Sequence, residues 1–76
     1  MKFIQFQEFI IPIDNIEYLW LDPEPGEFLY FQIELRTRNG ESLTEQFNFS
    51  EYESQGKCAI AAAERFAHLF MLVNRD

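Results

Sequence analysis

The chain of 76 residues carries 13 acidic and 6 basic side chains, a formal net charge of −7, with a single cysteine and a single histidine. That length predicts one domain, residues 1–76, which buries only about 60–65% of the surface exposed by its unfolded form. The composition excludes an internal disulfide and a zinc site built from cysteine and histidine, and the few scattered basic residues argue against binding to nucleic-acid phosphates.

The N-terminal segment, residues 2–12, is predicted to be extended. Its apolar side chains are Phe3, Ile4, Phe6, Phe9, Ile10 and Ile11. Their alternation breaks at the polar residues before Phe9, which indicates two short strands or one strand with a bulge. Pro12 lacks an N–H group, so it places this segment at a sheet edge or a strand end. Lys2 is the only positive charge before a polar interruption, which argues against a signal peptide, and the lone thiol of Cys58 favours the cytoplasm.

The next strand is predicted over Ile16 to Leu21, after a turn at Asp14-Asn15. An acidic loop, Asp22 to Gly26, follows it and contains two prolines. Its carboxylates could offer oxygen atoms to calcium, but the loop lacks the ligand spacing and the glycine of an EF-hand. A solvated turn is therefore the better interpretation.

The length of this loop decides which side chains of the strand face the core. A four-residue loop, Pro23 to Gly26, pairs Trp20 with Leu29 on the inner face. It leaves four apolar side chains together on the outer face: Leu19, Leu21, Phe28 and Tyr30. An odd number of loop residues instead puts Tyr18 and Trp20 on the outer face. In both cases one end of the sheet is apolar on two sides, so the N-terminal segment or another molecule must cover the second side.

Residues 27–50 are predicted to form a β-hairpin, because apolar and polar side chains alternate on both sides of a turn at Asn39-Gly40. A two-residue loop would mix apolar and polar side chains on both faces of the hairpin, which a half-buried sheet avoids. A three-residue loop, Arg38 to Gly40 with the glycine in the left-handed conformation, instead pairs Leu35 with Leu43. We therefore prefer the three-residue loop.

One acidic residue disturbs the hairpin pattern. In the preferred register, Glu45 lies on the apolar face opposite Ile33. A bulge in the strand or a solvated strand end would account for this position. The alternative is a carboxylate with a perturbed pKa at a functional site.

The C-terminal segment is predicted to be a helix. Ser50 to Glu53 fits a capping box, and Gly56 delays firm helix until Lys57. Two apolar rows follow: Ala59, Ala62, Phe66, Leu69 and Val73 form the first, and Ile60, Ala63, Ala67 and Phe70 form the second. Together they cover roughly 200° of the helix surface, whereas an ordinary surface helix buries a stripe of about 100°. The excess, concentrated in residues 69–73, is more than one small sheet covers, and charged residues exclude a membrane span.

Residue types that carry chemistry are few and unsuitably placed. Cys58 and His68 are the one combination of a thiol with a base, but ten residues of helix separate them by about 15 Å along the axis. The glutamates form no pair at a defined spacing, and three scattered glycines form no phosphate-binding loop. The sequence predicts no catalytic residue, no cofactor and no metal site, with Cys58 as a small buried hydrophobe.

Three segments resemble those of small uncharacterised bacterial proteins in which a β-meander is closed by one C-terminal helix. They are Ile13-Asp14-Asn15-Ile16, Leu35 to Glu41, and Ser50 to Glu53. The pattern also resembles, loosely, single sub-units of PH-like sheet-and-helix modules. The resemblance implies a sheet-and-helix fold and no particular activity, because these segments are turn and cap signals and a full PH-like barrel needs more strands.

The sequence thus predicts an α+β fold, an antiparallel β-meander of three to five strands with one C-terminal α-helix packed on one face. Nine Phe, three Tyr and one Trp are many for this length, and they can fill a small core or form a contact surface. We expect a small soluble, non-enzymatic protein-interaction module that forms a homodimer or a larger homo-oligomer. Apolar burial would drive association, and the acidic exterior would suppress nonspecific contacts.

Two groups of contact residues are expected. The helix contributes Leu69, Phe70, Met71 and Leu72. The sheet contributes Leu19, Leu21, Phe28 and Tyr30. The alternative function is that of a small-molecule binder with an aromatic-lined pocket between helix and sheet. Neither a nucleic acid nor a membrane is an expected partner.

Overall fold

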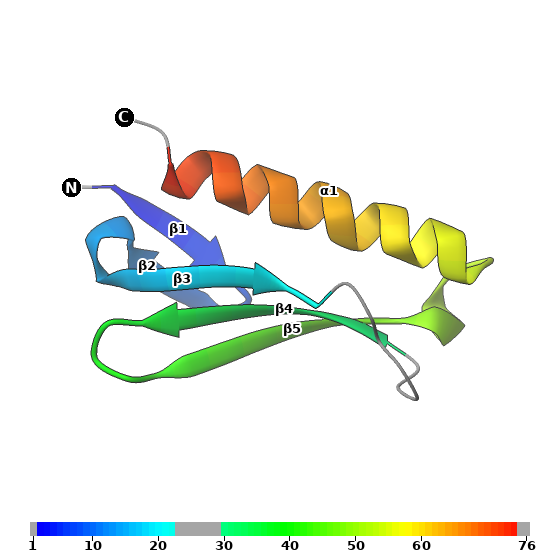
Figure 1. Cartoon of the computed structure of the whole chain (residues 1–76), viewed down its shortest axis with the longest axis horizontal. Coiled ribbons are helices and arrows are strands. Elements are labelled where there is room, and N and C mark those ends of the chain that lie inside the picture. Colours follow the sequence, from blue (N-terminus) through cyan, green and yellow to red (C-terminus); the bar gives the residue numbers. More distant parts are fainter. Residues whose placement is uncertain (1, 23–29, 75–76) are drawn as a thin grey trace.

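The computed structural model describes residues 2–22 and 30–74 and shows an α+β fold (Figure 1). The described residues form five antiparallel strands in two sheets, followed by one α-helix. The elements are β1 (Phe3–Phe6), β2 (Phe9–Pro12), the 3-10 helix η1 (Ile13–Asn15), β3 (Ile16–Leu21), β4 (Tyr30–Thr37), β5 (Ser42–Asn48), the 3-10 helix η2 (Phe49–Glu51) and α1 (Gln55–Val73). Strands β1 and β2 form one sheet, and β3, β4 and β5 form the other in that order. The predicted fold class is confirmed.

The hairpin of β4 and β5 has the predicted three-residue loop. Leu35 pairs with Leu43 and Phe31 pairs with Phe47. Gly40 has φ of 95°, the left-handed conformation that a side chain would strain. This register places the apolar residues of both strands on one inner face.

The N-terminal segment forms two short strands, which confirms one of the two expected alternatives. Phe6 pairs with Phe9 across a tight turn, in which Gln7 adopts φ of 57°. The turn is tied to the larger sheet because Gln7 Nε2 donates a hydrogen bond to the carbonyl oxygen of Thr44 at 2.6 Å. The small sheet therefore docks onto β5 through its turn.

The register of β3 on β4 corresponds to the odd-loop alternative, so the four-residue loop is wrong. Leu19 pairs with Leu35 and Leu21 pairs with Ile33, and both leucines pack against the core. The side chains of Tyr18 and Trp20 lie on the outer face, where the two residues are 41% and 56% exposed. The physical reason is that leucine is wholly apolar, whereas the aromatic residues have a polar group that can remain in water. Phe28 and Leu29 lie outside the described residues.

The core lies between the inner face of the larger sheet and two covering elements. Its main cluster joins residues of both sheets and the helix: Ile4, Phe6, Ile11, Ile16, Ile33, Leu35 and Leu69. A second cluster, beside the start of α1, contains Phe31, Cys58 and Ala62. The N-terminal strands thus share the inner face with α1 (Figure 1), and the outer-face side chains of Tyr18 and Trp20 stay exposed.

The helix begins later than the capping box predicted. Its N-cap is Ser54, whose Oγ accepts a hydrogen bond from the Lys57 N–H at 3.1 Å. Ser50 lies instead in η2, and Tyr52 follows with extended backbone at φ −126° and ψ 157°. Phe49 explains the delay, because its ring packs on Phe31 with centroids 5.1 Å apart and the chain turns there before α1 starts.

Two glycine substitutions should change stability in opposite directions. Gly56→Ala should raise the free energy of unfolding by about 0.4–1 kcal/mol, because alanine reduces the freedom of the unfolded chain. The added Cβ meets only Ser54 Oγ, at an ordinary 3.8 Å. Gly40→Ala should lower it by about 1–2 kcal/mol, because the φ of 95° is strained for alanine. Urea unfolding followed by circular dichroism measures both, and a loss of stability in Gly56→Ala would contradict the observed helix start.

Candidate functional site

Helix α1 carries apolar residues on two sides, and only one side is covered. Cys58, Ala62 and Leu69 are buried on the inner side. A second line of apolar residues is exposed to solvent, and we call it the outer row: Ile60, Ala63, Ala67 and Phe70. Ile60 is 59% and Phe70 is 50% exposed, and the neighbouring Met71 is 69% exposed. The helix therefore carries surplus apolar surface as predicted, but not concentrated in residues 69–73. Leu69 is buried and Leu72 and Val73 pack against the core, whereas the outer row and Met71 are exposed.

The structure separates the four helix residues that the sequence grouped as contact residues. Leu69 is fully buried in the core, and Leu72 is half-buried against it. Phe70 and Met71 are exposed. The reason is geometric, because successive residues of an α-helix point about 100° apart and four in a row cannot share one face.

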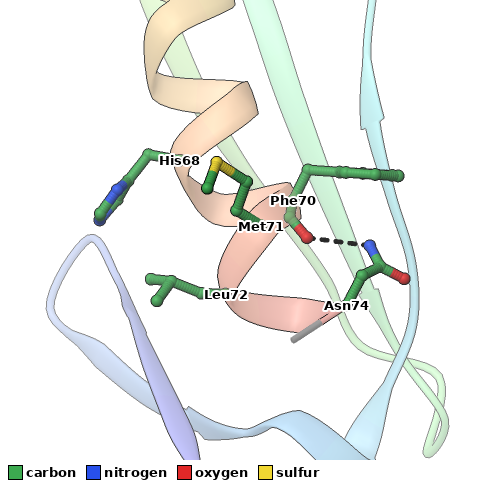
Figure 2. Close-up of a pocket in the computed structure, with 5 residues that line it drawn as sticks. All are labelled: His68, Phe70, Met71, Leu72 and Asn74. Carbon is green, nitrogen blue, oxygen red and sulfur yellow. Dashed lines mark hydrogen bonds between the residues drawn. The ribbon is translucent and has the colours of Figure 1, made fainter. Parts of the chain in front are cut away.

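A hollow of about 510 Å³ lies at the C-terminal end of α1 (Figure 2). The residues that line it are His68, Phe70, Met71, Leu72 and Asn74. Asn74 is the C-cap of the helix: its N–H makes the last helical bond to the carbonyl oxygen of Phe70 at 3.0 Å, and its Nδ2 donates to the same oxygen at 2.9 Å. All lining residues belong to one helix end, so the hollow is a feature of the exposed side of α1.

The structure also separates the four predicted contact residues of the sheet. Leu19 and Leu21 pack against the core, and Tyr30 is half-buried opposite Asn48. Phe28 lies outside the described residues. The exposed aromatic residues are instead Tyr18, whose hydroxyl donates to Glu34 Oε1 at 3.3 Å, and Trp20. The odd-loop register had identified this pair as the other possible occupant of the outer face.

Sequence reasoning missed a third exposed apolar group, on the N-terminal strands. Phe3, Phe9 and Ile10 are 52%, 45% and 71% exposed. Ile10 pairs with Gln5, and Ile4 pairs with Ile11 on the buried face. In β1, exposed and buried residues alternate from Phe3 to Phe6. In β2, three apolar residues follow one another from Phe9 to Ile11, so the sequence does not indicate which of them are exposed.

Glu45 occupies the predicted position opposite Ile33, and its partner is on the helix. Arg65 Nε donates to Glu45 Oε1 at 3.0 Å, and both side chains are mostly buried. A second guanidinium nitrogen, Nη2, donates to the carbonyl oxygen of Gln5 at 3.3 Å. Strand β5 runs through this position without a shift in register, so neither a bulge nor a solvated end is needed. The pair joins β5, α1 and the N-terminal strands.

The thiol of Cys58 is fully buried at the start of α1. Its Sγ–H donates to the carbonyl oxygen of Phe47 at 3.2 Å. Burial, and to a lesser degree the negative charge of Glu51, raises the pKa of the thiol above its usual value of 9.0. The sulfur is thus protonated at neutral pH and acts as a small packing residue. His68 is exposed and lines the hollow at the other end of the helix.

Comparisons with protein-family models, with curated proteins and with solved structures find no match for this chain. No activity comes to it from a relative, and the resemblance to PH-like modules stays a prediction. Within residues 2–22 and 30–74, no group of three or more His, Cys, Asp and Glu side chains could hold a metal ion. In the same part of the chain, no helix is both long and apolar enough to cross a membrane.

Removing one member of the Glu45–Arg65 pair should lower the free energy of unfolding more than removing both. Arg65→Ala should lower the free energy of unfolding by about 1–2 kcal/mol, because the mostly buried carboxylate loses its partner. The double variant Glu45→Leu/Arg65→Leu should lose less, since it leaves no unpaired charge. Urea unfolding of the wild type, the single variants and the double variant measures the coupling. Losses that simply add would show that the pair contributes no coupling.

The Cys58 thiol should be protected in the folded protein. We expect slow reaction with a disulfide reagent at neutral pH and full reaction after unfolding, because the thiol is buried and its pKa is raised. The folded state holds this proton more tightly than the unfolded state. The resulting stability is therefore present below the ordinary thiol pKa of 9.0 and declines above it. Cys58→Ala is the control, and an equal alkaline loss of stability in that variant would assign the effect to other groups.

Proposed function

We propose that the protein is a non-enzymatic interaction module that self-associates through the outer side of α1. The observation that carries this proposal is the exposure of Ile60, Phe70 and Met71 on a helix whose opposite side is buried in the core. Exposed apolar groups of this kind usually mark contact surfaces. The apolar surface provides the driving force of association, and the shape of the helix surface provides its specificity.

The available area fits a reversible dimer. If a fully exposed large side chain presents about 200 Å², the exposed fractions of Ile60, Phe70 and Met71 amount to about 350 Å² of apolar surface per copy. Two copies with the bordering polar residues then bury about 1,000 Å² or slightly more, near the lower limit for a specific interface. We therefore expect an equilibrium between monomer and dimer that depends on protein concentration.

Charge opposes this association. Each copy carries a formal charge of −7, so two copies repel each other over the range of the Debye length. Added salt screens the repulsion without removing the apolar attraction. The fraction of dimer should therefore rise with salt. For an interface held by ion pairs, the fraction of dimer would instead fall with salt.

The alternative function, binding of a small apolar molecule, is favoured by one observation. The hollow at the end of α1 has a volume of about 510 Å³, within the range of about 300–1,000 Å³ for ligand sites. Its lining comes from a single helix end, so a bound molecule would stay open to solvent on its far side. A second protein surface would close the hollow, which makes self-association the better proposal.

A charge on the helix should dissociate the dimer without unfolding the chain. Met71→Glu places a carboxylate in the exposed apolar surface, and we expect it to shift the monomer–dimer equilibrium toward monomer by about tenfold or more, equivalent to at least about 1.4 kcal/mol. Gln46→Glu is the matched control, because it adds the same charge at an exposed position of β5. Light scattering over a dilution series, at low and high salt, measures both.

The single tryptophan identifies the surface that associates. Trp20 lies on the outer face of the sheet, away from the outer row, and is 56% exposed. Dimerisation through α1 should leave its fluorescence and its quenching by acrylamide unchanged between dilute and concentrated protein. A blue shift with loss of quenching would assign the interface to the sheet. A monomer at all concentrations and salts would overturn the proposal.

A further inference from the structure

The outer row has the spacing of a helix–helix contact. Ile60, Ala63, Ala67 and Phe70 are separated by three, four and three residues, as are the a and d positions of a coiled coil. The two ends of the row are large and its middle is alanine. Alanine allows two helix axes to approach to about 8 Å, at the short end of the usual range. The row spans about 15 Å, roughly three helical turns.

We propose that two copies of this chain pair through their α1 helices in antiparallel orientation, with a two-fold axis between Ala63 and Ala67. The inference rests on the proposed self-association and specifies its geometry. In this arrangement Ile60 of each copy lies opposite Phe70 of the other, and Ala63 lies opposite Ala67. The same surface then serves both copies, as a two-fold interface requires.

Two features of the helix favour antiparallel over parallel pairing. Ile60 projects at the N-terminal end of the row, whereas the hollow bordered by Phe70 and Met71 lies at its C-terminal end (Figure 2). Antiparallel pairing places the projecting Ile60 of each copy beside the hollow of the other. Parallel pairing places two hollows together and leaves them unfilled. The helix dipoles are also opposed only in the antiparallel arrangement.

The charged residues beside the outer row are compatible with antiparallel pairing and limit the strength of the dimer. Lys57 lies one turn before Ile60, and its ammonium group pairs with Glu53 of the same chain. Antiparallel pairing brings this lysine toward the C-terminal end of the other helix, where positive charge is favourable. Glu64 lies beside the axis, and the two copies bring their Glu64 carboxylates close together. This repulsion adds to that of the net charge and keeps the dimer reversible.

The repulsion gives a first measurement that depends on the geometry. Glu64→Gln should tighten the dimer, because it removes two like charges at the axis. Glu41→Gln, at an exposed position of the β4–β5 turn, changes the net charge equally and is the matched control. A larger gain for Glu64→Gln than for Glu41→Gln supports antiparallel pairing about this axis. Equal gains would overturn it.

Cysteine crosslinking tests the residue pairs directly. Ile60→Cys and Phe70→Cys variants are prepared separately in the full chain and mixed under mild oxidation. A disulfide requires Cα atoms within about 7 Å, which antiparallel pairing provides only between position 60 of one copy and position 70 of the other. In the mixed dimer the second Ile60–Phe70 contact remains intact. Cys58 is buried, so the wild-type chain serves as the background control.

The expected result is a covalent dimer in the mixture and none in either variant alone, with the disulfide between positions 60 and 70 confirmed by mass spectrometry of the linked peptides. A covalent dimer of the Ile60→Cys variant alone would show parallel pairing and overturn the inference. A dimer by light scattering that does not crosslink in the mixture would also overturn it, while leaving self-association intact. A wild-type monomer by light scattering would overturn both proposals.

Discussion

The loop from Arg38 to Gly40 sets the orientation of every side chain in β4 and β5. With Gly40 in the left-handed conformation, three residues connect the strands and Leu35 faces Leu43. A loop one residue shorter or longer would move the apolar residues of one strand to the other face. Because β4 is the central strand of the larger sheet, the position of β3 and the face available to α1 both follow from this register.

The same register forces an acidic residue onto the inner face, where Arg65 compensates its charge. Glu45 cannot turn to the outer face without moving Leu43 and Phe47 out of the core. Arg65 therefore reaches across from α1 to the carboxylate, and its other nitrogen bonds the backbone of Gln5. The ion pair lies where β5, α1 and the N-terminal strands meet. The buried Cys58, Ala62 and Leu69 turn one side of α1 toward the core, which leaves the outer row facing solvent.

The sequence predicted the register of β4 on β5, because two alternating patterns and one glycine allowed a single consistent pairing. The expected C-terminal end of this hairpin was wrong, since Phe49 and Ser50 lie in η2. The sequence left two registers open for β3, since Leu19 and Leu21 alternate with Tyr18 and Trp20 and either set of large side chains can fill a core. In the structure, Leu19 and Leu21 pack against the core, in line with the preference of leucine for an apolar environment. The helix start was missed because Ser50 and Ser54 both suit an N-cap, and only the packing of Phe49 on Phe31 selects the second.

The contact residues were harder to predict than the presence of surplus apolar surface. The positions of the apolar residues in the sequence predict how much of the helix surface is apolar. Which part of that surface is covered depends on the elements that pack against the helix. The buried residues of the larger sheet and of the N-terminal strands form one core cluster with Leu69, so both sheets pack against the same side of α1. The outer row therefore stays largely exposed, although the ring of Phe70 packs on Phe66 with centroids 5.8 Å apart. Its symmetric order of large, small, small and large residues is what a second copy of the same helix would complement.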